Sequence, residues 1–210
     1  MSILIENIKE LVQVEEIPRL LVKGKDMAKL KTIKNAFLFI ENGIISAFGK
    51  MAELDKQGIL LSTDNVKAVD ANGKMVFPSF VDSHTHLVYP ASREIEYIDK
   101  IKGLSYEEIA QRGGGILNSA KLMQDTSDEE LVENALVRLN EIISYGTGAV
   151  EIKSGYGLTV ESELKMLRVI KRLKQLSPLT IKATFLGAHS IPMEYRDNQE
   201  KYVDIVDDFI

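Results

Sequence analysis

Cysteine is absent from the 210-residue chain, which excludes a disulfide framework and any zinc or iron–sulfur site with thiolate ligands. The chain also lacks a net positive charge. It has 26 Lys and Arg residues and 31 Asp and Glu residues, which gives a net charge of −5. Proteins that bind nucleic acid usually carry a basic surface. We therefore expect no nucleic-acid partner, and we interpret the basic residues 171–174 as the solvated face of a helix.

Long apolar runs are also missing. No uncharged apolar stretch approaches the roughly 20 residues needed to cross a bilayer. Residues 1–10 lack the basic start and the long apolar core of a secretory signal. The composition, with 45% hydrophobic and 27% charged residues, is typical of a globular protein large enough for one or two domains. The expectation is a soluble, cytoplasmic protein with no membrane partner.

Residues 1–76 have the pattern of a β-rich domain, with short apolar runs between turn signals. Strands are expected at residues 2–5, 36–40, 44–48 and 66–69. The turn sequence at residues 41–43, Glu-Asn-Gly, predicts a hairpin between the second and third of these strands. We expect a small antiparallel domain, with a short helix over residues 51–57.

The pattern changes at residue 77, where strands and helices begin to alternate. Strands are expected at residues 79–83, 149–152 and 179–186. Capping boxes at Ser105 and Ser127 mark two helix starts, a third helix should end before Pro178, and a last one should begin at Tyr202. Such alternation predicts a parallel sheet covered by helices. A closed eight-stranded barrel takes about 250 residues, so this segment is expected to be either an open sheet or part of a barrel.

All three histidines follow predicted strands. His84 and His86 end the first strand, and His189 follows the third. Strand side chains alternate between faces, so His84 and His86 should point the same way and could both bind one Zn²⁺ or iron ion. The carboxyl ends of parallel strands are also where such folds carry their sites. Chance alone produces His-x-His pairs as well, and a lone histidine such as His189 is more often a loop or core residue.

Other side chains could serve a site at the same edge of the sheet. The glycines around Tyr156 could form a simple tight turn or present its phenol to a pocket. Glu151 and Lys153 share one strand face, where they could pair with each other or lie near the metal. Arg93 could bind a carboxylate bidentately, although a surface arginine is the default interpretation. The triple glycine 113–115 could approach a ligand or form a loop.

Several stretches together resemble a known family. Residues 77–88, FPSFVDSHTHLV, are similar to the metal-binding opening of the amidohydrolase superfamily. Further stretches are similar to the imidazolonepropionase family within it, namely SRE at 92–94, GGGIL at 113–117, VEIKSGYGL at 150–158, ELKMLR at 163–168 and TFLGAH at 184–189. The resemblance covers nearly the whole chain, whereas the histidine pair alone would identify only the superfamily.

The resemblance implies hydrolysis of the cyclic amide of 4-imidazolone-5-propanoate to N-formimidoyl-L-glutamate in histidine degradation. It also implies a β-sandwich and a (β/α)₈ TIM barrel, with one bound Zn²⁺ or Fe²⁺/Fe³⁺ ion. By the same match, His84 and His86 would bind the metal. Arg93 and Tyr156 would bind the substrate, and His189 would bind the substrate and act in catalysis.

The family's remaining metal ligands and general base lie on later strands. The resemblance therefore implies an N-terminal half, made of a β-rich domain over residues 1–76 and the first part of a barrel over residues 77–210, inactive by itself. The expected partner is a small-molecule substrate, and a homodimer is an open expectation. Two alternatives remain open, namely another amidohydrolase such as a deaminase or dihydroorotase-like enzyme, and a non-catalytic fragment.

Overall fold

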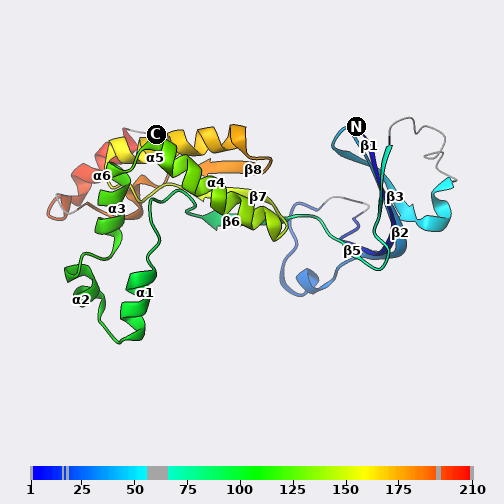
Figure 1. The fold of residues 1–210 in the computed structure, drawn as a ribbon, viewed down its shortest axis with the longest axis horizontal. Helices are drawn as coiled ribbons and strands as arrows, with labels where there is room; N and C mark the ends of the chain where they lie inside the picture. The colour runs from blue at the N-terminus through cyan, green and yellow to red at the C-terminus, as the bar shows by residue number, and fades with distance from the viewer. Residues whose placement is uncertain (1, 16, 18, 56–65, 193–194, 209–210) are drawn as a thin grey trace. The chain divides into compact units, whose positions relative to one another are not determined.

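The structure is a computed structural model and describes residues 2–15, 17, 19–55, 66–192 and 195–208 (Figure 1). It contains two compact units, Met1–Pro78 and Ser79–Ile210. In the described ranges, none of the helices combines the length and the apolar character required to cross a bilayer.

Met1–Pro78 contains a five-stranded sheet in the order β3-β2-β1-β4, with β5 paired to β1. Its elements are β1 (Ser2–Val12), η1 (Gly24–Ala28), β2 (Thr32–Glu41), β3 (Ile44–Lys50), η2 (Met51–Glu53), β4 (Val66–Asp70) and β5 (Met75–Val76). β2 and β3 form the predicted hairpin. Its turn residues Asn42 and Gly43 have positive φ angles of 50° and 81°, as a type I′ turn requires. Where a helix was predicted over residues 51–57, the structure has the short η2. Residues 56 and 57 of the predicted helix lie outside the described ranges.

The prediction of a wholly antiparallel sheet was wrong. β1 pairs antiparallel with β2 but parallel with β4 and β5. β3 lies at one edge of the sheet, and β4 lies on the other side of β1 and runs in the same direction as β1. Apolar alternation identifies a strand but carries no information on which edge it joins, which is why the sequence did not reveal this arrangement.

Successive side chains of β2 enter two separate apolar clusters. One cluster contains Leu4, Phe37, Phe39 and Leu54, and the other contains Ile8, Leu11, Ala36, Leu38 and Ala71. Because neighbouring strand residues point to opposite faces, both faces of the sheet carry buried apolar side chains. The strands described in this unit lie in one sheet.

Ser79–Ile210 contains a parallel three-stranded sheet in the order β6-β7-β8, as the alternating pattern predicts. Its strands are β6 (Phe80–Thr85), β7 (Thr147–Lys153) and β8 (Thr180–Thr184). Its helices are α1 (Glu94–Ile101), α2 (Tyr106–Gln111), α3 (Ile116–Asp125), α4 (Asp128–Ser144), α5 (Val160–Leu176), η5 (Gly187–His189) and α6 (Gln199–Asp207). Figure 1 shows α4 and α5 running along this sheet.

Helices α4 and α5 begin at capping side chains. Ser127 Oγ accepts a hydrogen bond from the Glu130 N–H, and Thr159 Oγ1 accepts one from the Ser162 N–H, both at 3.2 Å. Their apolar stripes bury a shared core with β7, which contains Leu131, Val132, Ala135, Leu139, Val150, Ile152, Met166, Val169, Ile170 and Leu173. β6 pairs parallel with β7, and β7 with β8, so the carboxyl ends of the three strands meet at one edge.

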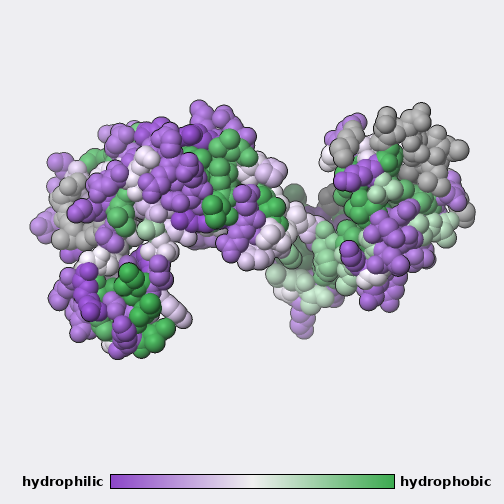
Figure 2. Space-filling view, in the orientation of Figure 1, coloured by the Kyte–Doolittle hydropathy of each residue, from purple (hydrophilic) through white to green (hydrophobic). Residues whose placement is uncertain are grey.

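The helices outside this core depart most from expectation. α1 and α3 were not predicted, and α6 begins at Gln199, where Asn198 accepts a hydrogen bond from the Lys201 N–H. α1 has one buried residue, Asp99, and its apolar side chains are largely exposed, visible as green patches around α1 and α2 in Figure 2. α1 is eight residues long and its N-cap residue, Arg93, makes no capping hydrogen bond, so it lacks the start signal that marks α2 and α4 in the sequence.

Candidate functional site

The structure brings the three histidines together at the carboxyl edge of the parallel sheet. His84 lies near the end of β6, His86 directly follows that strand, and His189 lies in η5 after β8. The ring centroid of His86 is 5.7 Å from that of His84 and 5.2 Å from that of His189. Parallel strands place their carboxyl ends at the same edge, so residues far apart in the sequence meet here.

Tyr156 joins the histidines from the loop after β7. Its ring is stacked on His86, with centroids 4.6 Å apart and an interplanar angle of 19°. The Tyr156 ring is also 5.8 Å from that of His189. The phenol therefore belongs to the same cluster of rings, which we call the ring cluster: His84, His86, Tyr156 and His189.

The end of β6 is fixed by a side-chain hydrogen bond to β7. Thr85 Oγ1 donates to the backbone carbonyl of Glu151 at 2.6 Å. The side chain of Thr85 thus faces the neighbouring strand. The backbone N–H of His84 donates to Asp82 Oδ1 at 3.2 Å, a second hydrogen bond near the end of β6.

His86 has the properties of an imidazole that is neutral at neutral pH. Burial lowers its pKa most, the nearby rings of His189 and His84 lower it further, and the backbone of Ser154 partly opposes these effects. Its Nδ1 is buried and has no hydrogen-bond partner among the described residues. A neutral imidazole with a free nitrogen can bind a metal ion. Within the described ranges, however, no group of three or more His, Asp or Glu side chains could hold a metal ion.

Glu151 and Lys153 form the ion pair that their shared strand face suggested. Glu151 also accepts a hydrogen bond from Thr184 Oγ1 on β8, at 2.6 Å. The hydrogen bond from Lys153 lowers the pKa of Glu151 most, followed by that from Thr184, and His84 makes a smaller contribution. Because its pKa is lowered, this carboxylate is ionised at neutral pH.

Arg93 precedes α1 and is held by a carboxylate of that helix. Its guanidinium donates through Nε to Glu96 Oε1 at 2.8 Å and through Nη2 to the other carboxylate oxygen. The hydrogen bonds to Glu96 raise the pKa of Arg93 most, and Tyr156 and Tyr106 contribute to the rise. Glu96 Oε1 also accepts the N–H of Gly115 at 2.8 Å, which places the triple glycine next to this pair.

A cavity of about 180 Å³ lies beside Arg93, between α1, α2 and α3. Its lining includes Arg93, Glu96, Asp99, Arg112 and the glycines 113 and 114. Arg112 donates to Asp99 at 2.9 Å, so each arginine here has an acidic partner. Sequence reasoning found Arg93 but missed Glu96, for which the spacing Arg-x-x-Glu at the start of a helix is a usable signal.

Sequence reasoning also missed two buried polar side chains behind the ring cluster. Ser154 is fully buried, and its Oγ accepts the N–H of Leu186 at 2.9 Å. Glu163 is 3% exposed and accepts hydrogen bonds from the loop that carries Tyr156. Neither residue type is expected in a core, and nothing in the local sequence distinguishes Glu163 from the exposed carboxylates beside it.

Curated proteins named imidazolonepropionase are similar to this chain along nearly its whole length. The protein from Christiangramia forsetii is 55% identical over 206 residues, which are 98% of this chain and 49% of that protein. The proteins from Flavobacterium johnsoniae and Clostridium tetani are 53% and 42% identical, over 97% and 87% of this chain and 48% and 43% of their own lengths. The chain thus spans about half the length of the curated relatives it matches. No protein-family model matches it.

Solved structures share the fold at low sequence identity. E. coli guanine deaminase has a TM-score of 0.57 and 15% identity, over 89% of this chain and 36% of that one. An uncharacterised metal-dependent hydrolase from Pyrococcus furiosus has a TM-score of 0.52 and 13% identity, over 96% of this chain and 52% of that one. These likenesses show a mixed α/β fold common to the three proteins.

Proposed function

Because this chain is homologous to the imidazolonepropionases along almost its whole length, we propose that it supplies part of the active site of such an enzyme. The reaction is hydrolysis of the cyclic amide of 4-imidazolone-5-propanoate to N-formimidoyl-L-glutamate, in histidine degradation. The observation that carries this proposal is the ring cluster, in which His86 lies 4.6 Å from Tyr156 and 5.2 Å from His189 at the carboxyl edge of a parallel sheet. We assign β6, β7 and β8 to the first strands of a (β/α)₈ barrel, and Met1–Pro78 to a β-sandwich of which one sheet is described.

We assign His84 and His86 to one bound zinc or iron ion. The buried, unpartnered Nδ1 of His86 and the lowered pKa of that ring support this assignment, because both favour a neutral imidazole ligand. An ion of this kind acts as a Lewis acid that polarises an amide carbonyl and activates water. Two imidazoles fall short of the usual four-coordinate shell, so the other ligands and the general base would come from outside the described residues.

Tyr156 and His189 would orient the imidazolone ring. Both rings lie beside His86, and each side chain offers a polar atom that can hydrogen-bond to a ring nitrogen or oxygen. A planar substrate hydrogen-bonded to these two side chains would present its amide to the histidine pair. His189 would also assist the reaction, as a group in direct contact with the ring.

Arg93 would bind the propionate group. A guanidinium has five N–H donors in a planar fork, and Glu96 takes two of them. The remaining edge can receive a second carboxylate bidentately. Glu96 would therefore keep the fork in place while the substrate binds.

The test is metal binding and turnover. We expect the chain to bind zinc or iron in a way that is lost in His84→Ala and His86→Ala and retained in Lys182→Ala, an exposed position on β8. We expect negligible turnover of imidazolonepropionate by the chain alone. Turnover should appear when the chain is co-expressed with the other half of the Christiangramia forsetii relative. Two results would contradict the proposal: metal binding that does not depend on either histidine, or a co-expressed complex with no activity.

A further inference from the structure

The carboxylate of Glu163 ties down both residues that flank Tyr156. Its Oε2 accepts the N–H of Gly155 at 2.8 Å, and its Oε1 accepts the N–H of Gly157 at 2.7 Å. Glu163 lies in the first turn of α5, where the helix dipole favours a negative charge. Hydrogen bonds to an ionised acceptor are the stronger kind, so the phenol is carried on a backbone that is held on both sides.

The same loop lies directly against the segment that carries His189. A Cβ built on Gly155 would lie 2.8 Å from the Cβ of His189 and 3.0 Å from the carbonyl oxygen of Leu186. On the other side, a Cβ on Gly157 would lie 2.6 Å from the backbone nitrogen of Glu163. The loop is thus packed between α5 and η5, with no room for it to move away from either.

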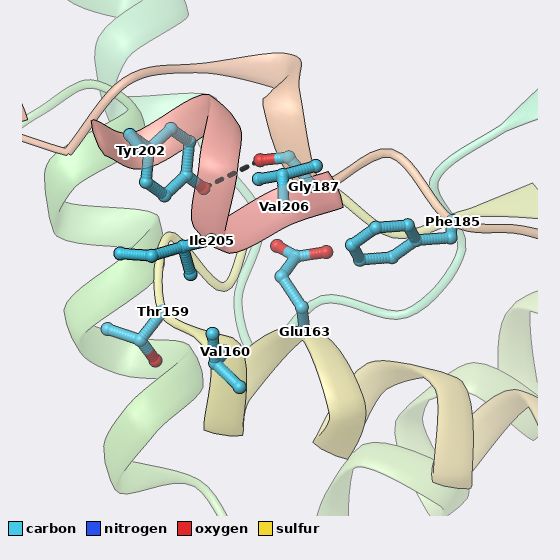
Figure 3. Close-up of a pocket in the computed structure, with 8 residues that line it drawn as sticks. All are labelled: Thr159, Val160, Glu163, Phe185, Gly187, Tyr202, Ile205 and Val206. Atoms are coloured by element: carbon cyan, nitrogen blue, oxygen red, sulfur yellow. Dashed lines mark hydrogen bonds between the residues drawn. The ribbon is translucent and has the colours of Figure 1, made fainter. Parts of the chain in front are cut away.

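The segment of His189 is supported from its far side by α6. Tyr202 donates a hydrogen bond to the Gly187 carbonyl at 2.6 Å and is itself buried. Figure 3 shows the Glu163 carboxylate rising from α5 toward Gly187, near Phe185 and the hydroxyl of Tyr202. Burial raises the pKa of Tyr202 most and the charge of Glu163 raises it further, so this phenol stays a hydrogen-bond donor.

From these contacts we propose that Glu163 is a positioning residue that sets the rings of Tyr156 and His189 against His86. It acts through the backbone, first on Gly155 and Gly157 and then through the close approach of Gly155 to His189. This inference rests on the proposed function in one respect, namely that the rings of Tyr156 and His189 bind the substrate. The carboxylate bracket itself, meaning Glu163 bonded to both glycines, is tested without catalysis.

Nuclear magnetic resonance of the metal-free chain tests the bracket directly. The amides of Gly155 and Gly157 should exchange slowly with solvent in the wild-type chain, because both are hydrogen-bonded and buried. In Glu163→Gln the side chain offers one acceptor oxygen and one NH₂ group, so one of the two glycines loses its bond. That amide should exchange about tenfold faster or more, given the usual worth of a hydrogen bond to a charged group. Fast exchange of both amides in the wild-type chain would overturn the proposal.

The histidine ring signals test whether the bracket positions the cluster. The chain has three histidines, and all lie in the ring cluster, so each Cε1–H signal reports on it. His84→Gln and His189→Gln assign the signals. At fixed pH, Glu163→Gln should change the chemical shifts of the His86 and His189 signals. The His86 signal should move in the same direction as it does in Tyr156→Leu. The matched control is Glu161→Gln, which removes a charge from the same helical turn at an exposed side chain paired with Arg168 at 3.3 Å.

Glu163→Asp keeps the charge but shortens the side chain, so it cannot reach both glycines and should reproduce the shifts of Glu163→Gln. It also keeps the test decisive where the glutamine variant does not fold. Unchanged histidine signals in a folded Glu163 variant would overturn the positioning role, even with a faster glycine amide. Failure of the proposed function can be told apart from failure of this positioning role. An inactive co-expressed complex would contradict the proposed function, but it would not change the glycine exchange rates or the histidine signals measured on the chain alone.

Discussion

Thr85 links two strands at the point where the candidate metal ligands lie. Its hydroxyl donates to the Glu151 carbonyl at 2.6 Å, across the only parallel pairing that β6 makes in the described sheet. The register between β6 and β7 slips just before it, between Asp82 and Thr85, where β6 accommodates an extra residue. Such bulges re-aim side chains next to active sites, so the hydrogen bond from Thr85 should hold the rings of His84 and His86 in their positions, with centroids 5.7 Å apart.

Thr85→Val keeps the shape of the side chain and removes the donor. A net hydrogen bond contributes about 1 kcal/mol to the free energy of unfolding. With a urea dependence of about 2 kcal/mol per molar, the unfolding midpoint should fall by about 0.5 M. Residues that orient metal ligands also tune affinity, so zinc or iron binding should weaken about tenfold. Urea unfolding followed by circular dichroism and competition with a metal-sensing dye measure the two effects.

The control is Thr180→Val, at an exposed position at the start of β8 whose hydroxyl makes no hydrogen bond within the described residues. It should leave both quantities near the wild-type values. The reasoning is refuted if the two variants have the same metal affinity. A lower unfolding midpoint with unchanged metal affinity would restrict Thr85 to a role in stability and would also contradict the claim that it orients the histidines.

Three further variants test the framework of the site. Leu139→Ala empties a fully buried position of α4 and should lower the free energy of unfolding by about 2–5 kcal/mol, whereas Val137→Ala, 69% exposed on the same helix, should change it little in the same urea titration. Arg138 donates to two backbone carbonyls in the segment that follows the histidines, so Arg138→Lys should lose about 1–3 kcal/mol in thermal or urea unfolding. The pKa of Glu96 is lowered mainly by its hydrogen bond from Arg93. Ionised Glu96 therefore stabilises the folded chain fully above its usual pKa of 4.5, and this stabilisation is lost as the pH falls through the lowered pKa of the folded state. Below about pH 4.5, the unfolding midpoint of the wild-type chain should drop more steeply with pH than the midpoint of Glu96→Gln.

The position of the candidate site was predictable because it depends on strand ends. Apolar runs that stop at a polar residue mark those ends, and parallel strands bring them to one edge. His84, His86 and His189 follow such runs, and the structure places their rings within 6 Å of a neighbour. The starts of α2 and α4 were predictable for a similar reason, since a cap is a local contact between residues close in sequence. Ser105 and Glu108 form both hydrogen bonds of the predicted capping box, whereas at α4 the structure shows one of the two, from the Glu130 N–H to Ser127 Oγ.

Features that depend on distant contacts were not predictable from one sequence. β4 pairs parallel with β1, a strand about 60 residues earlier in the chain, and no local pattern in either strand marks that pairing. α1 has no side-chain cap at Arg93 to mark its start in the sequence, and it is stabilised by contacts with residues further along the chain, such as that of Asp99 with Arg112. Glu163 has the same local surroundings as an exposed helical carboxylate, and its burial follows from a loop that folds over it.

The sequence left two interpretations of the glycines around Tyr156, a tight turn or a loop that presents the phenol. The structure shows a tight turn whose Tyr156 ring stacks on His86. Gly155 has a φ of +110°, which a side chain would strain, and it touches the segment of His189. Glu163 accepts hydrogen bonds from both glycine N–H groups of this turn, and Tyr156 between them stacks on His86. A substitution at either glycine should therefore disturb the ring cluster through the backbone, even though neither glycine has a side chain to contribute.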